Sequence, residues 1–161
     1  MTQRIVTVTV LVVTLVALWQ FWPSDERRIQ HLVQEMADAL QPAAGETDHA
    51  RVGRLAPLGR GLAADIVVEG PATARGREQV MAVAMQLGRV APQLSIVVRD
   101  VEVRVEPART AATALVTVAI TGVTGGASGG WDDITELQLD LTRHDDVWMV
   151  TRVAPVDVLR Q

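Results

Sequence analysis

The sequence of 161 residues contains no cysteine, no tyrosine and no lysine, and only 3% of its residues are aromatic. The absence of cysteine excludes disulfide bonds, thiol catalysis and thiolate metal sites. The absence of lysine makes every basic side chain an arginine. We interpret this as compositional bias, because alanine, valine, glycine and arginine are all abundant. A preference for bidentate anion contacts is the alternative interpretation.

The charge and the hydrophobic content indicate one globular domain with an appendage. The formal net charge is -4, and the arginines are dispersed rather than gathered in the basic stripe that nucleic-acid-binding proteins carry. Hydrophobic residues make up 48% of the chain, which is enough for a sizeable core in one domain. We therefore expect no nucleic acid among the partners.

A long segment of apolar residues and threonines, Ile5 to Trp22, lies near the start of the chain and is interrupted only by Gln20. As a helix it would reach about 27 Å, close to the thickness of the hydrocarbon layer of a bilayer. Aromatic residues gather at its end, as they do at membrane interfaces. The sequence therefore predicts a short tail at residues 1–4, a single-pass transmembrane anchor at residues 5–22 and a domain at residues 24–161.

A cleaved signal peptide is the alternative interpretation of this segment. The apolar run is longer than the usual hydrophobic region of a signal peptide, and no small-x-small cleavage site precedes Pro23. The anchor is therefore favoured. Because the tail before it is very short, we expect the domain on the extracytoplasmic side of the inner (cytoplasmic) membrane.

Apolar periodicity predicts three helices in the domain. The first begins after Ser24, a favourable N-cap residue. The second runs from Asp48 to Leu58 and the third from Arg77 to Leu87. The residues expected to face the core are Ile29, Leu32, Val33, Met36, Ala37 and Leu40 in the first helix, Val52, Leu55 and Leu58 in the second, and Val80, Val83, Ala84 and Leu87 in the third.

The region from Leu94 to Gly122 predicts a long β-hairpin that turns at residues 107–110. Its first strand changes phase, because apolar residues occupy even positions up to Val98 and odd positions from Val101 onward. A regular strand cannot place both sets against one core, so we predict a β-bulge at Arg99-Asp100. The alternation elsewhere predicts further strands at residues 63–69, 134–143 and 147–153.

Several features of this order resemble the nuclear transport factor 2-like superfamily, and within it the SnoaL-like bacterial proteins. They are Gly76-Arg77-Glu78 before the third helix, Pro92 after it, Thr121-Gly122 at the end of the hairpin, and Trp148 in the last strand. The resemblance covers residues 25–153. It implies an α+β fold of the cystatin-like type, in which a bent antiparallel sheet wraps around about three helices to form a cone. Members of the superfamily include isomerases, cyclases, dehydratases and non-catalytic binding domains, so the fold does not choose an activity.

Catalytic candidates are few. The isomerase relatives use a carboxylate base with a tyrosine hydroxyl, and this chain has no tyrosine. Asp65, near the expected mouth of the cone, is a candidate base if its side chain points inward. An exposed carboxylate at the start of a strand is the alternative interpretation. Arg99 and Asp100 could form a functional pair at the bulge, although a local salt bridge that supports the bend is the simpler expectation.

Four apolar side chains are candidates for lining a ligand cavity, with ordinary core packing as the alternative: Met81, Met85, Trp131 and Trp148. The three histidines, His31, His49 and His144, share no ligand spacing, so we expect no metal site. No motif indicates a cofactor.

Three functions remain open. The first is a membrane-tethered, non-enzymatic binding or protein-interaction module of the cell envelope, which holds an apolar small molecule in its cone or contacts an envelope protein. The second is a subunit of an envelope or secretion assembly. The third is a small isomerase or cyclase type of enzyme that acts on a lipophilic substrate. A homodimer formed through the outer face of the sheet is a further expectation.

Overall fold

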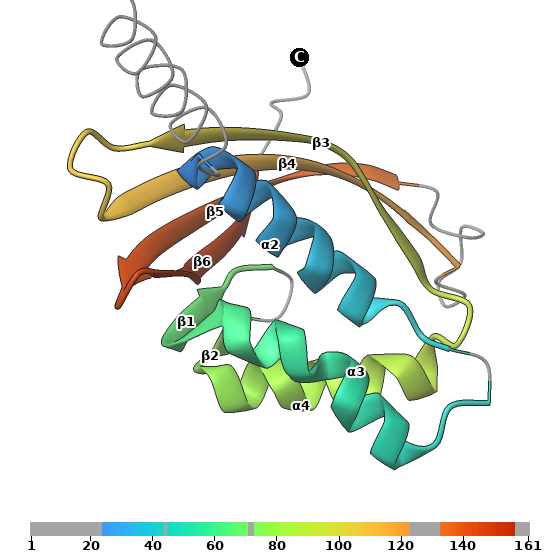
Figure 1. Cartoon of the computed structure of the whole chain (residues 1–161). Helices are drawn as coiled ribbons and strands as arrows, with labels where there is room; N and C mark the ends of the chain where they lie inside the picture. The colour runs from blue at the N-terminus through green and yellow to red at the C-terminus, as the bar shows by residue number, and fades with distance from the viewer. Residues whose placement is uncertain (1–23, 44, 71–72, 123–132, 157–161) are drawn as a thin grey trace, which may run out of the picture.

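The computed structural model describes residues 24–43, 45–70, 73–122 and 133–156 (Figure 1). The helices are α2 (Asp25–Leu40), α3 (Asp48–Gly61) and α4 (Arg77–Val90). The strands are β1 (Leu62–Val68), β2 (Ala74–Arg75), β3 (Ser95–Val105), β4 (Ala111–Thr121), β5 (Asp133–His144) and β6 (Val147–Pro155). This order matches the predicted sequence of helices and strands, apart from the two-residue strand β2, which was not predicted.

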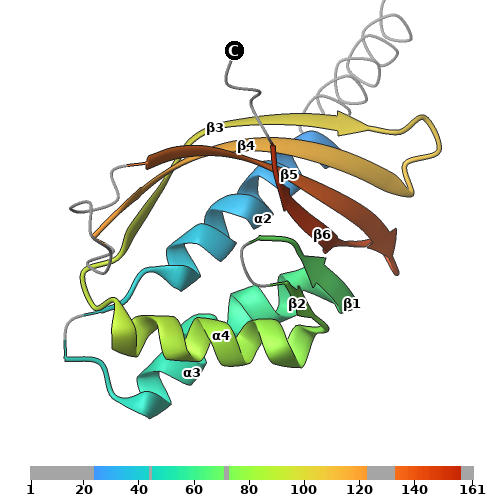
Figure 2. The same ribbon diagram turned by 180° about the vertical axis from the view of Figure 1, so that it is seen from behind.

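The strands form one six-stranded sheet in the order β2-β1-β6-β5-β4-β3. Strands β3 to β6 pair antiparallel, whereas β1 lies parallel to β6. Figures 1 and 2, which view the molecule from opposite sides, show the sheet curving over α2 while α3 and α4 lie together beneath it. The helices therefore occupy the concave side of the sheet, and the convex side is left without a covering element in the described part of the chain.

The predicted bulge in β3 is confirmed, because the pairing of β3 with β4 shifts between Val98 and Asp100. The shift lets the even-numbered apolar residues before it and the odd-numbered ones after it pack against the same core. A second shift, in the pairing of β5 with β6 between Asp140 and Leu141, leaves Thr151 of β6 as the extra residue and was not predicted. The pairing of β1 with β6 also shifts, between Leu62 and Val67. These irregularities accompany the strong curvature of the sheet.

Helix α2 begins at its predicted cap, where Ser24 accepts a hydrogen bond from the Arg27 backbone. Two predicted core positions in the other helices are wrong, because Val52 and Val83 are 58% and 54% exposed. In α3 the buried positions follow Arg51, Leu55 and Leu58, so Val52 lies about 100° around the helix from that line. In α4 the core contacts come from Val80, Met81, Ala84 and Met85 instead.

Gly122 shows why the hairpin ends in Thr-Gly. Its φ of +84° is a conformation that residues with a side chain rarely adopt, and a Cβ at this position would overlap the carbonyl of Gln93. The end of β4 therefore lies directly against the loop that leads into β3.

The predicted anchor at residues 5–22 lies outside the described residues, so it stays a prediction. In the ranges that the structure does describe, every helix is too short or too polar to cross a bilayer.

Candidate functional site

The interior of the cone is lined by apolar side chains from both layers. The buried residues of the sheet in this core are Leu62, Ile66, Ala112, Ala114, Val116, Val118, Leu139, Leu141, Trp148 and Val150. Helices α2 and α3 contribute Ile29, Val33, Leu55 and Leu58 to the same cluster. Among the described residues the charged residue classed as buried is Arg51, which belongs to the start of α3. The described interior therefore offers apolar contacts rather than acid-base groups.

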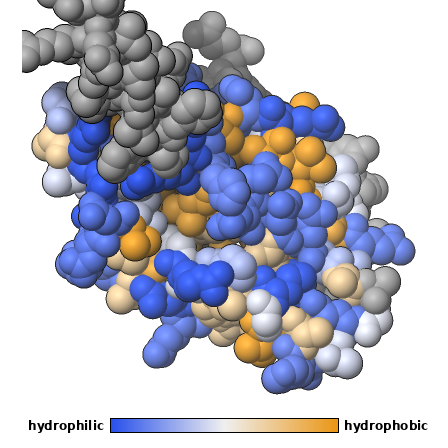
Figure 3. Space-filling model, in the orientation of Figure 1, coloured by the Kyte–Doolittle hydropathy of each residue, from blue (hydrophilic) through white to orange (hydrophobic). Residues whose placement is uncertain are grey.

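The structure brings three of the four predicted ligand-lining residues into this core. Met81 and Met85 are half-buried and pack against it, and Trp148 is one of its buried members. Trp131 lies outside the described residues. Figure 3 shows patches of hydrophobic surface between polar side chains on the side where the helices are seen. The partly exposed methionines could contribute to such apolar surface, because thioether side chains adapt to irregular neighbours.

A polar cluster lies where α2 begins, and we name its members, Asp25, Arg109, Arg143 and Trp148, the Asp25 cluster. Trp148 Nε1 donates a hydrogen bond of 3.3 Å to Asp25 Oδ1. Arg143 Nη1 is 3.5 Å from the same oxygen, and Arg109 Nε is 3.9 Å from Oδ2. The Asp25 side chain is only 10% exposed. The cluster therefore joins the start of α2 to β5, β6 and the turn between β3 and β4.

Arg143 is the most connected member of the Asp25 cluster. Its guanidinium lies over the Trp148 ring at 5.9 Å from the ring centre, and its Nη2 is 2.7 Å from Asp146 Oδ1. Its backbone N–H donates to the carbonyl of Thr110. Both Asp25 oxygens thus face positive or N–H groups. As arranged, the cluster holds the start of α2 against the sheet.

Sequence reasoning missed the Asp25 cluster because its members come from four separate segments. Asp25 directly follows the N-cap Ser24, and this position indicates only an acid in the first turn of a helix, which complements the helix dipole. The one available signal was Trp148, which lies in a strand expected to be buried. The N–H of a buried tryptophan usually donates a hydrogen bond, so a polar partner could be expected near it.

The predicted catalytic candidates lie outside the core. Asp65 is exposed on β1, which matches the alternative interpretation of a surface carboxylate and not that of a desolvated base. Arg99 and Asp100 are both exposed, and no ion pair joins them in the described structure, so the expected salt bridge at the bulge is wrong. The bulge is instead accommodated by the backbone pairing of β3 with β4.

The histidines do not form a metal site in the described part of the chain, where no group of three or more His, Cys, Asp or Glu side chains converges. His31 lies 3.4 Å from Glu35, and His144 lies 3.5 Å from Asp145. All three histidines are exposed. Their contacts are those of surface side chains.

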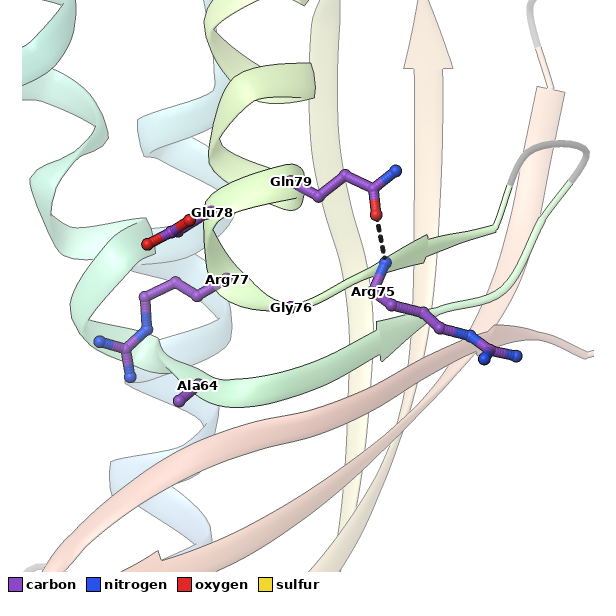
Figure 4. Close-up of a pocket in the computed structure, with 6 residues that line it drawn as sticks. All are labelled: Ala64, Arg75, Gly76, Arg77, Glu78 and Gln79. Atoms are coloured by element: carbon purple, nitrogen blue, oxygen red, sulfur yellow. Dashed lines mark hydrogen bonds between the residues drawn. The ribbon is translucent and has the colours of Figure 1, made fainter.

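A surface hollow of about 400 Å³ lies beside the start of α4 (Figure 4). Its lining residues are Ala64, Arg75, Gly76, Arg77, Glu78 and Gln79. Arg77 Nε donates to the carbonyl of Leu62, and Gln79 Oε1 accepts from the Arg75 backbone. In Figure 4 the side chains of Arg75 and Arg77 point in different directions. These polar groups thus brace the turn between β2 and α4, and the two arginines do not converge on one ligand position.

A second ionic cluster lies at the other end of α2. Arg54 binds Glu46 through two contacts, of 2.8 Å from Nε and 3.0 Å from Nη2, and also donates to the carbonyl of Ala39. Arg51 lies 3.4 Å from Glu46 and 2.8 Å from Asp48. The hydrogen bond from Arg54 holds the pKa of the Glu46 carboxyl below its usual value, and Arg89 does the same for the pKa of Asp48. This cluster fixes the loop between α2 and α3.

No protein-family model matches the sequence, and no curated protein sequence matches it. Solved structures do match. One is a nuclear transport factor 2-like protein with a cystatin-like fold from Novosphingobium aromaticivorans, which shares 19% sequence identity and superposes with a TM-score of 0.61. The match covers 95% of this chain and 91% of the other protein's chain. A proposed ketosteroid isomerase from Shewanella frigidimarina shares 19% identity, with a TM-score of 0.59 and coverage of 78% and 92%. A proposed scytalone dehydratase from Novosphingobium aromaticivorans shares 13%, with a TM-score of 0.63 and coverage of 81% and 83%. The domain therefore has the α+β, cystatin-like fold of nuclear transport factor 2-like proteins.

Proposed function

We propose that this protein is a membrane-tethered, non-enzymatic binding or protein-interaction module of the cell envelope, with its domain on the extracytoplasmic side of the inner membrane. The observation that carries the proposal is the apolar interior of the cone, in which the ionisable side chains of the described residues lie at the ends and on the outside. An enzyme of this fold that uses acid-base chemistry needs an inward carboxylate, and binding does not.

The connection between the apolar run and the domain supports the tether. Only Pro23 and Ser24 separate residues 5–22 from α2. Asp25, the first residue of α2, is bound to Trp148 and lies within reach of Arg143. The domain therefore has a fixed structure from its first helical residue onward, which suits a module held close to the membrane rather than one on a long linker.

The binding partner that suits the interior is an apolar small molecule. Half-buried apolar side chains, Met81 and Met85 among them, lie next to the buried core and can exchange protein contacts for ligand contacts at low cost. An envelope protein that contacts the outer surface is the other partner class in this proposal.

Alkaline extraction and protease treatment of bacterial cells test the tether. The full chain is expected to stay in the membrane pellet after alkaline washing, and protease added to spheroplasts is expected to digest the domain. A chain found in the alkaline supernatant, or a domain protected in intact spheroplasts, would contradict the proposal.

A small enzyme acting on a lipophilic substrate is the second candidate, because two of the structural neighbours carry the names of a proposed isomerase and a proposed dehydratase. The structure changes the carboxylate to be tested, since Asp25 is nearly buried beside Trp148 and Asp65 is exposed. Turnover that is lost in Asp25→Asn, with the fold retained, would favour this candidate over the binding module.

A further inference from the structure

Strand β3 forms one edge of the sheet, and its outer side pairs with no strand in the described structure. It is eleven residues long, far longer than β2 at the opposite edge. Figures 1 and 2 both show α2 running along the concave side of β3. A long edge strand presents unpaired backbone groups and is a template for pairing with another chain unless something covers it.

Two observations show which backbone groups of β3 point outward. Gln30 of α2 donates a hydrogen bond from Nε2 to the carbonyl of Val101 in β3. That carbonyl therefore points away from β4. On the other side, the Glu106 N–H donates to Ala111, so the even-numbered residues after the bulge point toward β4. Because antiparallel pairs alternate, the N–H and C=O groups of Val101, Val103 and Val105 face outward.

Helix α2 covers this edge only in part. Gln41 Nε2 donates to the carbonyl of Ile96, and Gln30 to that of Val101. From Val103 to Val105, the described residues supply no partner for the outward groups. In the segment Val101–Val105, between the bulge and the turn that begins at Glu106, only the Val101 carbonyl is therefore bonded from α2.

The side chains of this segment are self-complementary. Glu102 and Arg104 point to the convex side, are 57% and 77% exposed, and lie 2.9 Å apart. If a second copy pairs antiparallel with its centre at Val103, Glu102 of each copy lies opposite Arg104 of the other. The same register places Val103 opposite Val103, and Val101 opposite Val105, on the apolar face. Opposite charges that face each other across an antiparallel pair stabilise it.

We propose that β3 pairs edge to edge with β3 of a second copy of this chain over Val101–Val105, which joins the two sheets into one. The backbone groups are compatible with this register, because the residues whose N–H and C=O groups face outward lie opposite one another and can exchange N–H···O bonds. A carbonyl has two lone pairs, so Val101 can accept from the second copy while it keeps the bond from Gln30. The partner in this interface is a second copy, and the interface goes beyond the tethering and ligand binding proposed above.

Charge exchange between Glu102 and Arg104 tests the pairing in the full chain, solubilised in a nonionic detergent, by sedimentation equilibrium. Wild type is expected to dimerise. Glu102→Arg and Arg104→Glu alone are each expected to weaken the dimer roughly tenfold or more, since two facing pairs become repulsive per dimer. The double exchange and an equimolar mixture of the two single variants are expected to restore dimers. Arg99→Glu, which changes the charge equally at the bulge, is the matched control and should leave the dimer unchanged.

The contradicting results are equally definite. A wild-type chain that stays monomeric up to high micromolar concentration overturns the proposal. A dimer whose affinity is the same in both single variants as in wild type overturns it too, and indicates an interface elsewhere, such as the convex face. Thermal melting of each variant shows that it is folded, so loss of the dimer is not confused with loss of the domain. Because the chain has no cysteine, Val103→Cys gives a second measurement, in which the pairing across the symmetry axis predicts one oxidised dimer.

Discussion

The two ends of helix α2 are held by different kinds of ionic contact. At the end of the helix, Glu46 binds Arg54 at 2.8 and 3.0 Å, and these partners are eight residues apart in the sequence. At its start, Asp25 contacts Trp148, Arg143 and Arg109 at 3.3 to 3.9 Å, and the residues that it contacts lie in other parts of the chain. One cluster is tight and local, and the other is looser and long-range.

This difference indicates different roles. The Glu46 cluster fixes a loop between two neighbouring helices, which is a matter of stability. The Asp25 cluster joins the first residue of α2 to β5, β6 and the turn between β3 and β4, so it fixes the start of the domain against the sheet. The following predictions are designed to separate the two roles, beginning with the largest expected effect.

Replacement of Trp148 should give the largest loss of stability. Trp148→Ala removes a buried side chain from the core and is expected to cost about 3–5 kcal/mol of the free energy of unfolding. Trp148→Phe keeps most of the packing and loses the bond to Asp25, so it should cost about 1 kcal/mol or slightly more. Urea denaturation of the full chain in detergent measures both. Equal costs for the two variants would mean that the hydrogen bond, and not the packing, holds Trp148.

Neutralising the two carboxylates compares the clusters directly. Asp25→Asn keeps an acceptor for Trp148 but loses the charge that faces Arg143, and it should cost about 1–2 kcal/mol. Glu46→Gln should lower the Tm further, because its contacts to Arg54 are shorter and bidentate. Glu78→Gln, an exposed change of the same kind, is the control. A larger effect at Asp25 would reverse the assignment of the tight and the loose cluster.

The Glu46 cluster should contribute to the pH dependence of stability. The pKa of Glu46 in the folded protein is lowered from its usual 4.5 by the hydrogen bond from Arg54. The resulting stability is present above pH 4.5 and is lost as the pH falls through the lower pKa of the folded state. The midpoint of urea unfolding should therefore drop between neutral and acidic pH, and this drop should be smaller in Glu46→Gln. Parallel curves for the two proteins would contradict the contribution of Glu46.

Asp65→Asn should have the smallest effect. Its side chain is exposed and outside both clusters, so the free energy of unfolding should change by less than about 0.5 kcal/mol. The binding module also predicts unchanged ligand retention in this variant. Loss of a retained ligand would return Asp65 to the list of functional residues.

Much of the fold could be predicted from local pattern. The change of phase between Val98 and Val101 located the bulge, because side chains alternate strictly along a strand and only an inserted residue restores the face. The error at Val52 arose because an arginine, Arg51, takes the buried position next to it in α3. In α4, alanine, valine and methionine occupy seven of the fourteen positions, so periodicity alone could not tell which of them face the core.

The Asp25 cluster could not be predicted in the same way. Its members come together only through the pairing of β5 with β6 and the position of the turn between β3 and β4, and neither is written in the residues around Asp25. The edge of β3 differs, because part of it could be predicted. Its alternating Val-Glu-Val-Arg-Val pattern was visible in the sequence, but which backbone groups were left open depended on Gln30 of a distant helix.

Native mass spectrometry of the full chain, released from detergent micelles without added ligand, tests the binding module most directly. The account predicts a folded species that carries an additional mass, lost on denaturation and extractable into organic solvent. A spectrum in which the folded chain is always empty, from membranes of the cells that produced it, would contradict an apolar ligand in the cone.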